Sequence, residues 1–269
     1  MRPFGAIYAK SPPSLARLGV LPFFCLTLFA QPQIGGGACN SATLNGTYSL
    51  TISGRDVNST ATITTVSLGV GTAFFDGLSK LTLTLTSNTA KSSTAPQTLS
   101  GTYTMQANCI GTVAITSGDT ATFTLESYNE GRAYLLTGQD STYAFNASGN
   151  TLPATCAAAN LTGTYSFNGN GFTSNSGAIG GVVDFSGLLT FDGKSAVTGN
   201  WFISSGGSTK PAVTNGTFAM TTGCNGTANL TDASGNSYTL QLVMTAASGS
   251  FVMGGSTPQM IFTGSGRPL

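Results

Sequence analysis

Residues 39–49 read C-N-S-A-T-L-N-G-T-Y-S, and residues 156–166 read C-A-A-A-N-L-T-G-T-Y-S. In both stretches a cysteine stands five residues before a leucine, and Gly-Thr-Tyr-Ser follows. A chain that repeats such a phrase at a distance of more than a hundred residues is expected to hold two copies of one small domain.

Two further pairs of motifs support this duplication. The sequence G-T-Y-T-M-Q-A-N-C-I-G-T at 101–112 returns as G-T-F-A-M-T-T-G-C-N-G-T at 216–227, and F-D-G at 75–77 returns at 191–193. The three pairs of copies are offset by 117, 116 and 115 residues along the chain. The period is too long for a solenoid repeat and matches a whole domain, with small insertions in the loops. We therefore predict a first repeat over 39–147 and a second over 156–265, joined through 147–156.

Apolar and polar residues alternate through most of both repeats. Residues 80–86 read K-L-T-L-T-L-T, and 121–125 and 237–243 behave similarly, as half-buried strands require. Turn signals such as Asp-Gly and Asn-Glu-Gly separate these runs. The sequence predicts eight strands per repeat: near 44–54, 60–75, 79–87, 99–107, 110–117, 120–127, 131–137 and 141–146, and then 161–169, 179–191, 195–205, 214–222, 225–231, 236–245, 249–254 and 258–263.

Short strands at regular spacing suit a sandwich or a barrel. The connections are too short for helical crossovers, so the strands are expected to pair antiparallel. Sequential hairpins favour an up-and-down meander, and eight strands can close around their own side chains. The fold prediction is therefore all-β, with two tandem antiparallel up-and-down eight-stranded β-barrels.

The first 30 residues have the composition of a secretory signal peptide. Arg2, Lys10 and Arg17 precede an apolar run over 18–30, which is too short for a membrane-spanning helix. The alternative is a lipoprotein signal with Cys39 as the lipidated residue. Cys156 corresponds to Cys39 and cannot be an N-terminus, which favours the secretory interpretation.

Four cysteines follow the predicted signal, two in each repeat. An even number behind a signal peptide indicates disulfides formed in an oxidising compartment. Because each domain must have folded alone before it was copied, we expect Cys39 to pair with Cys109 and Cys156 with Cys224. The sequence has no histidine and no closely spaced cysteine pair, so we expect no metal and no cofactor.

Charged residues make up 7% of the chain. Without the predicted signal, seven Lys and Arg stand against nine Asp and Glu, a net charge of about −2. No basic stripe is present, which argues against nucleic acid and anionic membranes as partners. The absence of histidine rules out Ser-His-Asp and Cys-His catalysis, so we expect no enzymatic activity.

A few side chains are candidate ligand contacts. Trp201, the only tryptophan, lies in an alternating strand and could stack on a ligand or fill a barrel. Tyr48 and Tyr165 are candidates for ligand contact or for core anchors, and Arg55 is a candidate in the mouth of the first barrel. Asp76 and Asp192 stand at equivalent places in the two copies. Each precedes a glycine, and an Asp-Gly hairpin turn is sufficient to explain an aspartate at that position.

The stretches L-N-G-T-Y at 44–48 and L-T-G-T-Y at 161–165 resemble the first-strand Leu-x-Gly-x-Trp motif of avidin-like and lipocalin-like (calycin) small β-barrels, with tyrosine in place of tryptophan. That resemblance implies an aromatic side chain closing one barrel end and a ligand held in the cup. The chain also resembles repeat-containing secreted bacterial proteins of unknown function.

These observations predict a non-enzymatic protein that is secreted, periplasmic or at the cell surface. It would bind a small apolar ligand or an envelope or surface partner. The alternative is a structural or adhesive cell-envelope protein with filled barrels and no ligand. The size of the side chains inside the barrels discriminates between these two roles. An enzyme and an outer-membrane barrel are the remaining classes.

Overall fold

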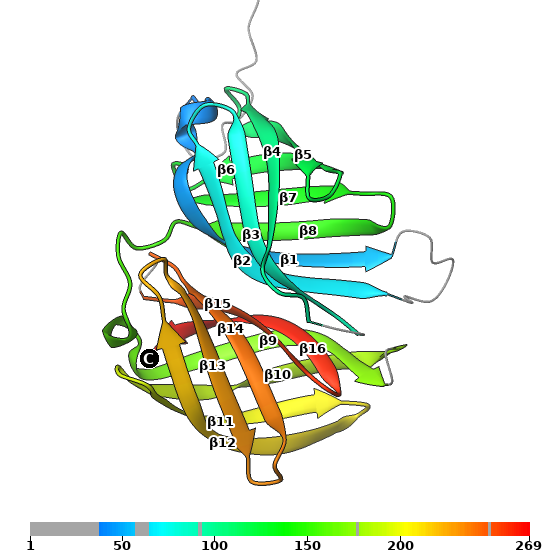
Figure 1. The fold of residues 1–269 in the computed structure, drawn as a ribbon, viewed down its shortest axis with the longest axis vertical. Helices are drawn as coiled ribbons and strands as arrows, with labels where there is room; N and C mark the ends of the chain where they lie inside the picture. Colours follow the sequence, from blue (N-terminus) through cyan, green and yellow to red (C-terminus); the bar gives the residue numbers. More distant parts are fainter. Residues whose placement is uncertain (1–37, 57–64, 91–92, 176–177, 247–248) are drawn as a thin grey trace, which may run out of the picture. The chain divides into compact units, whose positions relative to one another are not determined.

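The computed structural model of this chain describes residues 38–56, 65–90, 93–175, 178–246 and 249–269. The predicted signal peptide lies outside these residues. The first eight strands are β1 (Asn45–Asp56), β2 (Val66–Asp76), β3 (Lys80–Thr89), β4 (Gln97–Met105), β5 (Ile110–Ser117), β6 (Ala121–Tyr128), β7 (Ala133–Gln139) and β8 (Tyr143–Asn150). Each pairs antiparallel with the next, and β1 pairs with β8, so the sheet closes into a barrel (Figure 1).

The second set of strands repeats this topology. It comprises β9 (Thr162–Asn175), β10 (Ala178–Asp192), β11 (Ala196–Ser205), β12 (Ser208–Met220), β13 (Asn225–Asp232), β14 (Ser237–Met244), β15 (Phe251–Thr257) and β16 (Met260–Pro268). Antiparallel pairing of β16 with β9 closes the second barrel. The predicted fold class is therefore confirmed, because both copies are closed antiparallel barrels of eight strands.

Alternation along the strands builds each core. In β3, Leu81, Leu83 and Leu85 are buried while Lys80 and Thr84 face solvent. Successive side chains of a strand point to opposite faces, so every second residue enters the barrel. Each interior forms its own hydrophobic cluster. The cluster of the first barrel includes Tyr48 and Leu50, and that of the second barrel includes a group of aromatic side chains described below.

The two disulfides pair as the duplication predicts. Cys39 is bonded to Cys109 and Cys156 to Cys224, with a Cα–Cα distance of 4.9 Å in each bridge. The sulfur of Cys39 is consumed in this bond, which leaves no thiol for lipidation. Each bridge ties the segment before the first strand of its barrel to the loop after the fourth.

A short 3₁₀ turn follows the first cysteine of each copy: η1 (Ser41–Thr43) and η2 (Ala158–Asn160). In the first barrel the hydroxyl of Tyr103 donates to the carbonyls of Ser41 and Leu44, at 2.8 and 3.0 Å. Tyr48 and Tyr103 both make edge contacts with Phe75, at centroid distances of 5.5 and 5.0 Å. We call this the disulfide end of the barrel, and the opposite end the open end.

The strands extend further than the sequence predicts at several places. β8 continues to Asn150, so the connection to the second barrel begins later than residue 147. β12 begins at Ser208 although Pro211 lies within it. The pairing between β12 and β13 starts only at Thr214, so β12 has no neighbour on that side at Pro211. The missing N–H of the proline therefore removes no hydrogen bond to β13. The predicted start of the second strand, at 60–64, lies outside the described residues.

Residues 32–269 cluster as one compact unit. Within it, Val66 and Leu68 of β2 pack with Ile261 of β16 in a small buried cluster. The hydroxyl of Ser174 also donates to the carbonyl of Ala90, at 2.7 Å. None of the helices in the described part of the chain is long and apolar enough to cross a membrane.

Candidate functional site

The open end of the second barrel carries a cavity of about 720 Å³. Its walls come from the strand ends farthest from the disulfide, among them Thr173, Ile203, Lys210, Asp232, Tyr238 and Met260. A volume of this size is within the range of sites that hold small molecules, roughly 300–1,000 Å³. We call this cavity the cup.

Five aromatic side chains form the wall and floor beneath the cup. The aromatic cluster consists of Phe167, Phe185, Trp201, Tyr238 and Phe262. The indole of Trp201 lies 5.2 Å from the ring of Phe167 and 5.1 Å from that of Tyr238, between centroids. Phe185 and Phe262 meet edge to face at 5.0 Å. Edge-to-face packing of this kind holds the rings in defined orientations.

Glycines opposite the rings make room for them. Trp201 pairs across β10 with Gly187 and across β12 with Ala212, and Phe185 pairs with Gly169. A Cβ placed on Gly187 would overlap the backbone and Cβ of Trp201. The large side chains can therefore turn into the barrel only because their cross-strand neighbours are small.

A second, much smaller space lies next to the cup. It measures about 10 Å³ and is lined by Phe185, Trp201, Ile203, Met260 and Phe262. Ile203 and Met260 line both spaces, so these two side chains lie at the boundary between them. Met260 is unbranched and can change rotamer at low cost. A rearrangement at this boundary would extend the cup down to Trp201.

Two buried polar atoms inside the second barrel have no hydrogen-bond partner among the described residues: Trp201 Nε1 and Thr214 Oγ1. Trp201 is 2% exposed and Thr214 is fully buried. Thr214 of β12 lies opposite Gly199 of β11. Gly199 stands two residues before Trp201 and is on the same inward face of β11. The two groups therefore occupy neighbouring positions on the inner wall, where diagonal partners lie about 7–8 Å apart.

The polar groups at the rim are already engaged with one another. Asp232 Oδ2 accepts from the Tyr238 hydroxyl at 3.0 Å and from Asn236 Nδ2 at 2.8 Å, and its Oδ1 accepts from the backbone N–H groups of Ser234 and Asn236. Burial acts to raise the pKa of Asp232, but these hydrogen bonds outweigh it and hold the pKa below its usual value. Burial, followed by the adjacent Asp232 carboxylate, raises the pKa of Tyr238 to about 12. Both groups therefore keep their ordinary charge at neutral pH.

The first barrel carries different residues at the corresponding positions. Register equates Trp201 with Leu85, Phe185 with Gly69 and Tyr238 with Ala121. At the disulfide end the copies agree: Tyr48 and Tyr165, and Phe75 and Phe191, occupy matching places. The two copies thus share one end of the scaffold and differ at the open end.

The candidate residues from the sequence are spread over the molecule. Trp201 alone lies next to the cup. Tyr48 and Tyr165 are 1% and 3% exposed at the disulfide ends, and their hydroxyls donate to the carbonyls of Gly131 and Asn160, at 2.6 and 3.4 Å. Arg55 is exposed and alternates with the buried Gly54, which places its side chain on the outer face of β1 and away from the barrel mouth.

The recurring aspartates serve the hairpins. Asp76 Oδ1 accepts from three backbone N–H groups, those of Leu78, Ser79 and Lys80, at 2.8–2.9 Å. Asp192 does the same for residues 194–196, and Gly77 and Gly193 both have φ of 75°. These bonds account for both carboxylates without a ligand.

Sequence reasoning missed Phe185, Tyr238, Asp232 and Met260 as parts of one site. Asp232 and Tyr238 belong to the hairpin of β13 and β14, but Phe185 of β10 and Met260 of β16 lie far from it in the chain, and only closure of the barrel brings them together. One available signal was the glycine pair Gly169 and Gly171, which leaves space on β9 for the rings of Phe185 and Phe262.

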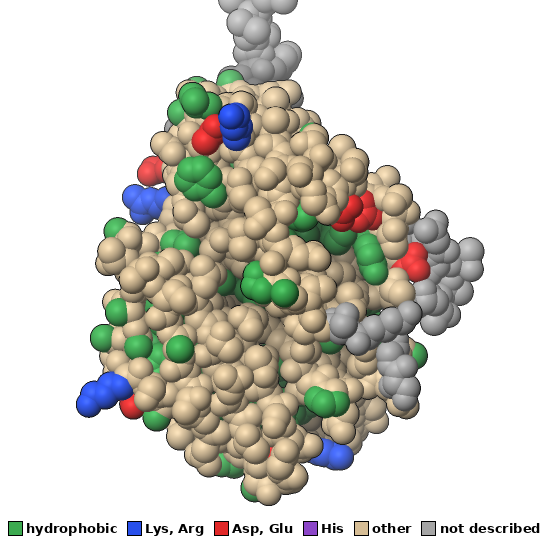
Figure 2. Space-filling view, in the orientation of Figure 1, with side chains coloured by type: hydrophobic (Ala, Val, Ile, Leu, Met, Phe, Trp, Pro, Cys, Tyr) green, Lys and Arg blue, Asp and Glu red, His purple; other side chains and the backbone are tan. Residues whose placement is uncertain are grey.

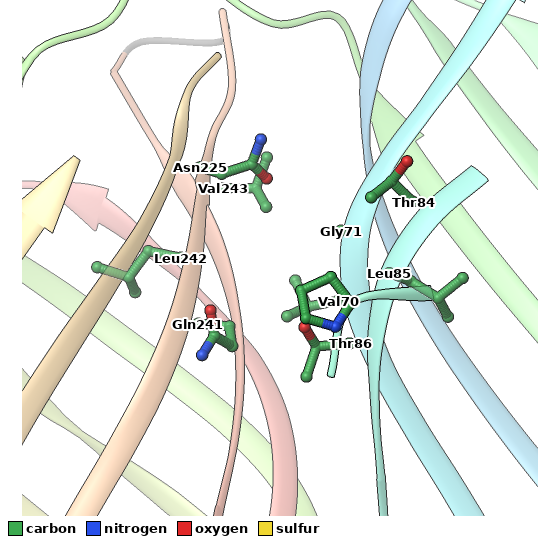
Figure 3. A pocket seen from close by; sticks show the side chains of 10 residues that line it. Val70, Gly71, Thr84, Leu85, Thr86, Asn225, Gln241, Leu242 and Val243 are labelled. Carbon is green, nitrogen blue, oxygen red and sulfur yellow. The ribbon is translucent and has the colours of Figure 1, made fainter. Parts of the chain in front are cut away.

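Two further hollows in the described part of the chain are smaller than the cup, and one of them, of about 510 Å³, is lined mainly by polar residues such as Asn168, Asn170 and Asp184. A pocket of about 150 Å³ is lined by side chains of β2 and β3 on one side and of β13 and β14 on the other, among them Val70, Thr86 and Gln241 (Figure 3). Its lining includes no charged group. The face shown in Figure 2 has few, scattered charges and mostly neutral polar surface. In the described part of the chain, no three His, Cys, Asp or Glu side chains gather as a metal site would need.

The fold and the site define a tandem pair of disulfide-tied, closed β-barrels, the second of which carries a cup at its open end. No protein-family model matches this chain, and no curated protein matches its sequence.

Proposed function

We propose that this protein is a non-enzymatic binding protein that holds a small, largely apolar ligand in the cup of its second barrel. The observation that carries the proposal is the cavity of about 720 Å³ next to a cluster of aromatic side chains. Small-molecule sites combine apolar side chains with placed polar groups. The cup has both, since Val183, Ile203 and Met260 line it together with a large number of polar residues. Two disulfides support a secreted, periplasmic or cell-surface location, because such bonds persist in oxidising compartments.

The alternative is a structural or adhesive envelope protein without a ligand. The first barrel favours this role for its own half of the chain, because bulky buried side chains fill its interior, including Leu50, Leu83, Phe123 and Leu136. The ligand-binding role and the structural role differ in what they predict for the second barrel: only the ligand-binding role predicts saturable binding in its cup.

The test uses the neutral fluorescent probe N-phenyl-1-naphthylamine with the purified full chain. We expect saturable binding of one probe per chain, with quenching of the single tryptophan, since Trp201 lies next to the cup. Ile203→Arg places a charge at the cup and should weaken binding at least tenfold. The matched control is Ser87→Arg, the corresponding inward position of the first barrel, which should leave binding unchanged. Unsaturable binding, or equal effects of both variants, would favour the structural role.

A further inference from the structure

We propose that Trp201 Nε1, with Thr214 Oγ1 beside it, selects a neutral ligand that carries a hydrogen-bond acceptor, such as a carbonyl, at the end entering the cup. This inference rests on the proposed function and specifies which chemistry the cup recognises. Four buried side-chain polar atoms have no partner among the described residues, and the inference starts from the two in the second barrel; the others, Asn88 Nδ2 and Ser127 Oγ, belong to the first.

An unpartnered buried donor is costly. Leaving such a group without a hydrogen bond costs the free energy of removing it from water, with no bond to offset that loss. Native proteins tolerate few such groups, and those that persist require an explanation. A ligand acceptor that reaches Nε1 would restore the missing bond in a site from which water is excluded.

The scaffold itself does not need these polar groups. At the corresponding positions of the first barrel stand Leu85 and Leu99, and that barrel closes with the same topology. Leucine fills the same inward positions without an unpaired donor or hydroxyl. The first barrel has an unpartnered buried hydroxyl elsewhere, Ser127 Oγ in β6, but it carries no polar side chain at the positions that correspond to Trp201 and Thr214.

The neighbouring polar groups cannot take over this role. The Tyr238 hydroxyl donates to Asp232, and the carboxylate of Asp232 accepts from Asn236 and Ser234 as well. The two charged side chains that line the cup, Lys210 and Asp232, are at its rim, while the aromatic cluster has no charged member. A charged group next to Trp201 would be buried without a counter-ion, which is strongly unfavourable. These features together favour a neutral acceptor.

The experiment compares two probes of equal shape: octan-2-one and 2-methyloct-1-ene, in which a methylene group replaces the carbonyl oxygen. Binding of each to the purified full chain is measured by calorimetry. We expect the ketone to bind about 3- to 10-fold tighter, the range that corresponds to one net hydrogen bond. This preference should disappear in Trp201→Phe, which keeps an aromatic ring and removes the N–H, and should shrink in the near-isosteric Thr214→Val.

A second measurement uses the unchanged protein, so it does not require the Trp201 and Thr214 variants to fold. Because the chain has one tryptophan, an ¹⁵N-labelled sample has a single indole N–H resonance. The ketone should move its proton downfield, as hydrogen bonding does, and the alkene should not. Equal affinities and equal shifts for both probes would overturn this inference while leaving the apolar cup intact. If neither probe binds, the proposed function fails together with it.

Discussion

Gly187 lies directly opposite Trp201 on the inner wall of the second barrel, and the Cα and Cβ of Trp201 occupy space that any side chain at 187 would need. This pairing of the smallest residue with the largest lets one strand project a ring into the barrel. The same relationship joins Gly169 with Phe185 and Gly171 with Phe262, so the floor of the cup depends on glycines.

Gly187→Ala is expected to destabilise the protein by about 1–3 kcal/mol, because the added methyl group overpacks the contact with Trp201. Gly181→Ala, in the same strand but with no atom within 4 Å of the added Cβ, is the control. It should be neutral or slightly stabilising, since alanine reduces the freedom of the unfolded chain. Urea unfolding measures both, and equal effects would contradict the packing argument.

Removal of one disulfide is expected to weaken its own barrel most. The bridges span 70 and 68 residues, for which chain entropy predicts about 4 kcal/mol each. Tryptophan fluorescence reports on the second barrel, which contains Trp201, whereas circular dichroism reports on both. Cys156→Ser/Cys224→Ser should lower the urea midpoint seen by fluorescence more than Cys39→Ser/Cys109→Ser does. The reverse order would contradict the assignment of one bridge to each barrel.

Acid should weaken the hairpins that follow β2 and β10. Backbone hydrogen bonds, first from Lys80 and Lys194 respectively, hold the pKa values of Asp76 and Asp192 below their usual range. A carboxyl group whose folded pKa is depressed contributes stability above its unfolded pKa, about 3.9, and loses it as the pH falls through the folded value. We therefore expect the unfolding free energy to fall below about pH 4.

The double variant Asp76→Asn/Asp192→Asn should flatten this acid dependence, because the amide keeps an acceptor oxygen and does not titrate. Asp119→Asn is the matched control, since Asp119 accepts a hydrogen bond from the N–H of Thr120 at its own turn. Unfolding in urea at pH 3 and pH 6 measures the effect. An unchanged acid dependence in the double variant would contradict the role of these carboxylates.

Tyr238 should weaken the folded state at high pH. Burial and then the adjacent Asp232 raise its pKa to about 12, above the value of 10.0 for a free phenol. A group with a raised folded pKa contributes stability below its unfolded pKa and loses it as the pH rises through the folded value. Stability should therefore decline between about pH 10 and 12. Tyr238→Phe should reduce this decline, measured by thermal unfolding across the range, and a steeper decline would contradict it.

The sequence by itself determined the duplication, the antiparallel strands and the pairing of the cysteines. These are local or copied signals: alternation with a period of two, Asp-Gly turns such as 76–77, and landmarks such as Cys39 and Cys156 at a constant offset. Each can be read over a few residues without knowledge of what lies across the barrel. For Tyr48 and Tyr165 the sequence left ligand contact and a role as core anchor both open, and the structure buries both side chains.

Only the tertiary structure decided which end and which copy carries the cup. Trp201, Tyr238 and Met260 belong to strands β11, β14 and β16, and barrel closure alone places them around the cup and the smaller space next to it. The sequence suggested Arg55 as a residue of the first barrel's mouth, but the structure places its side chain on the outer face of β1. Neighbouring residues of a strand point to opposite faces, so an error of one position reverses the expected direction. Whether the space at an inward position is filled depends on the side chains across from it on neighbouring strands. No local sequence pattern shows which distant segments pair, so the sequence alone does not locate a cavity.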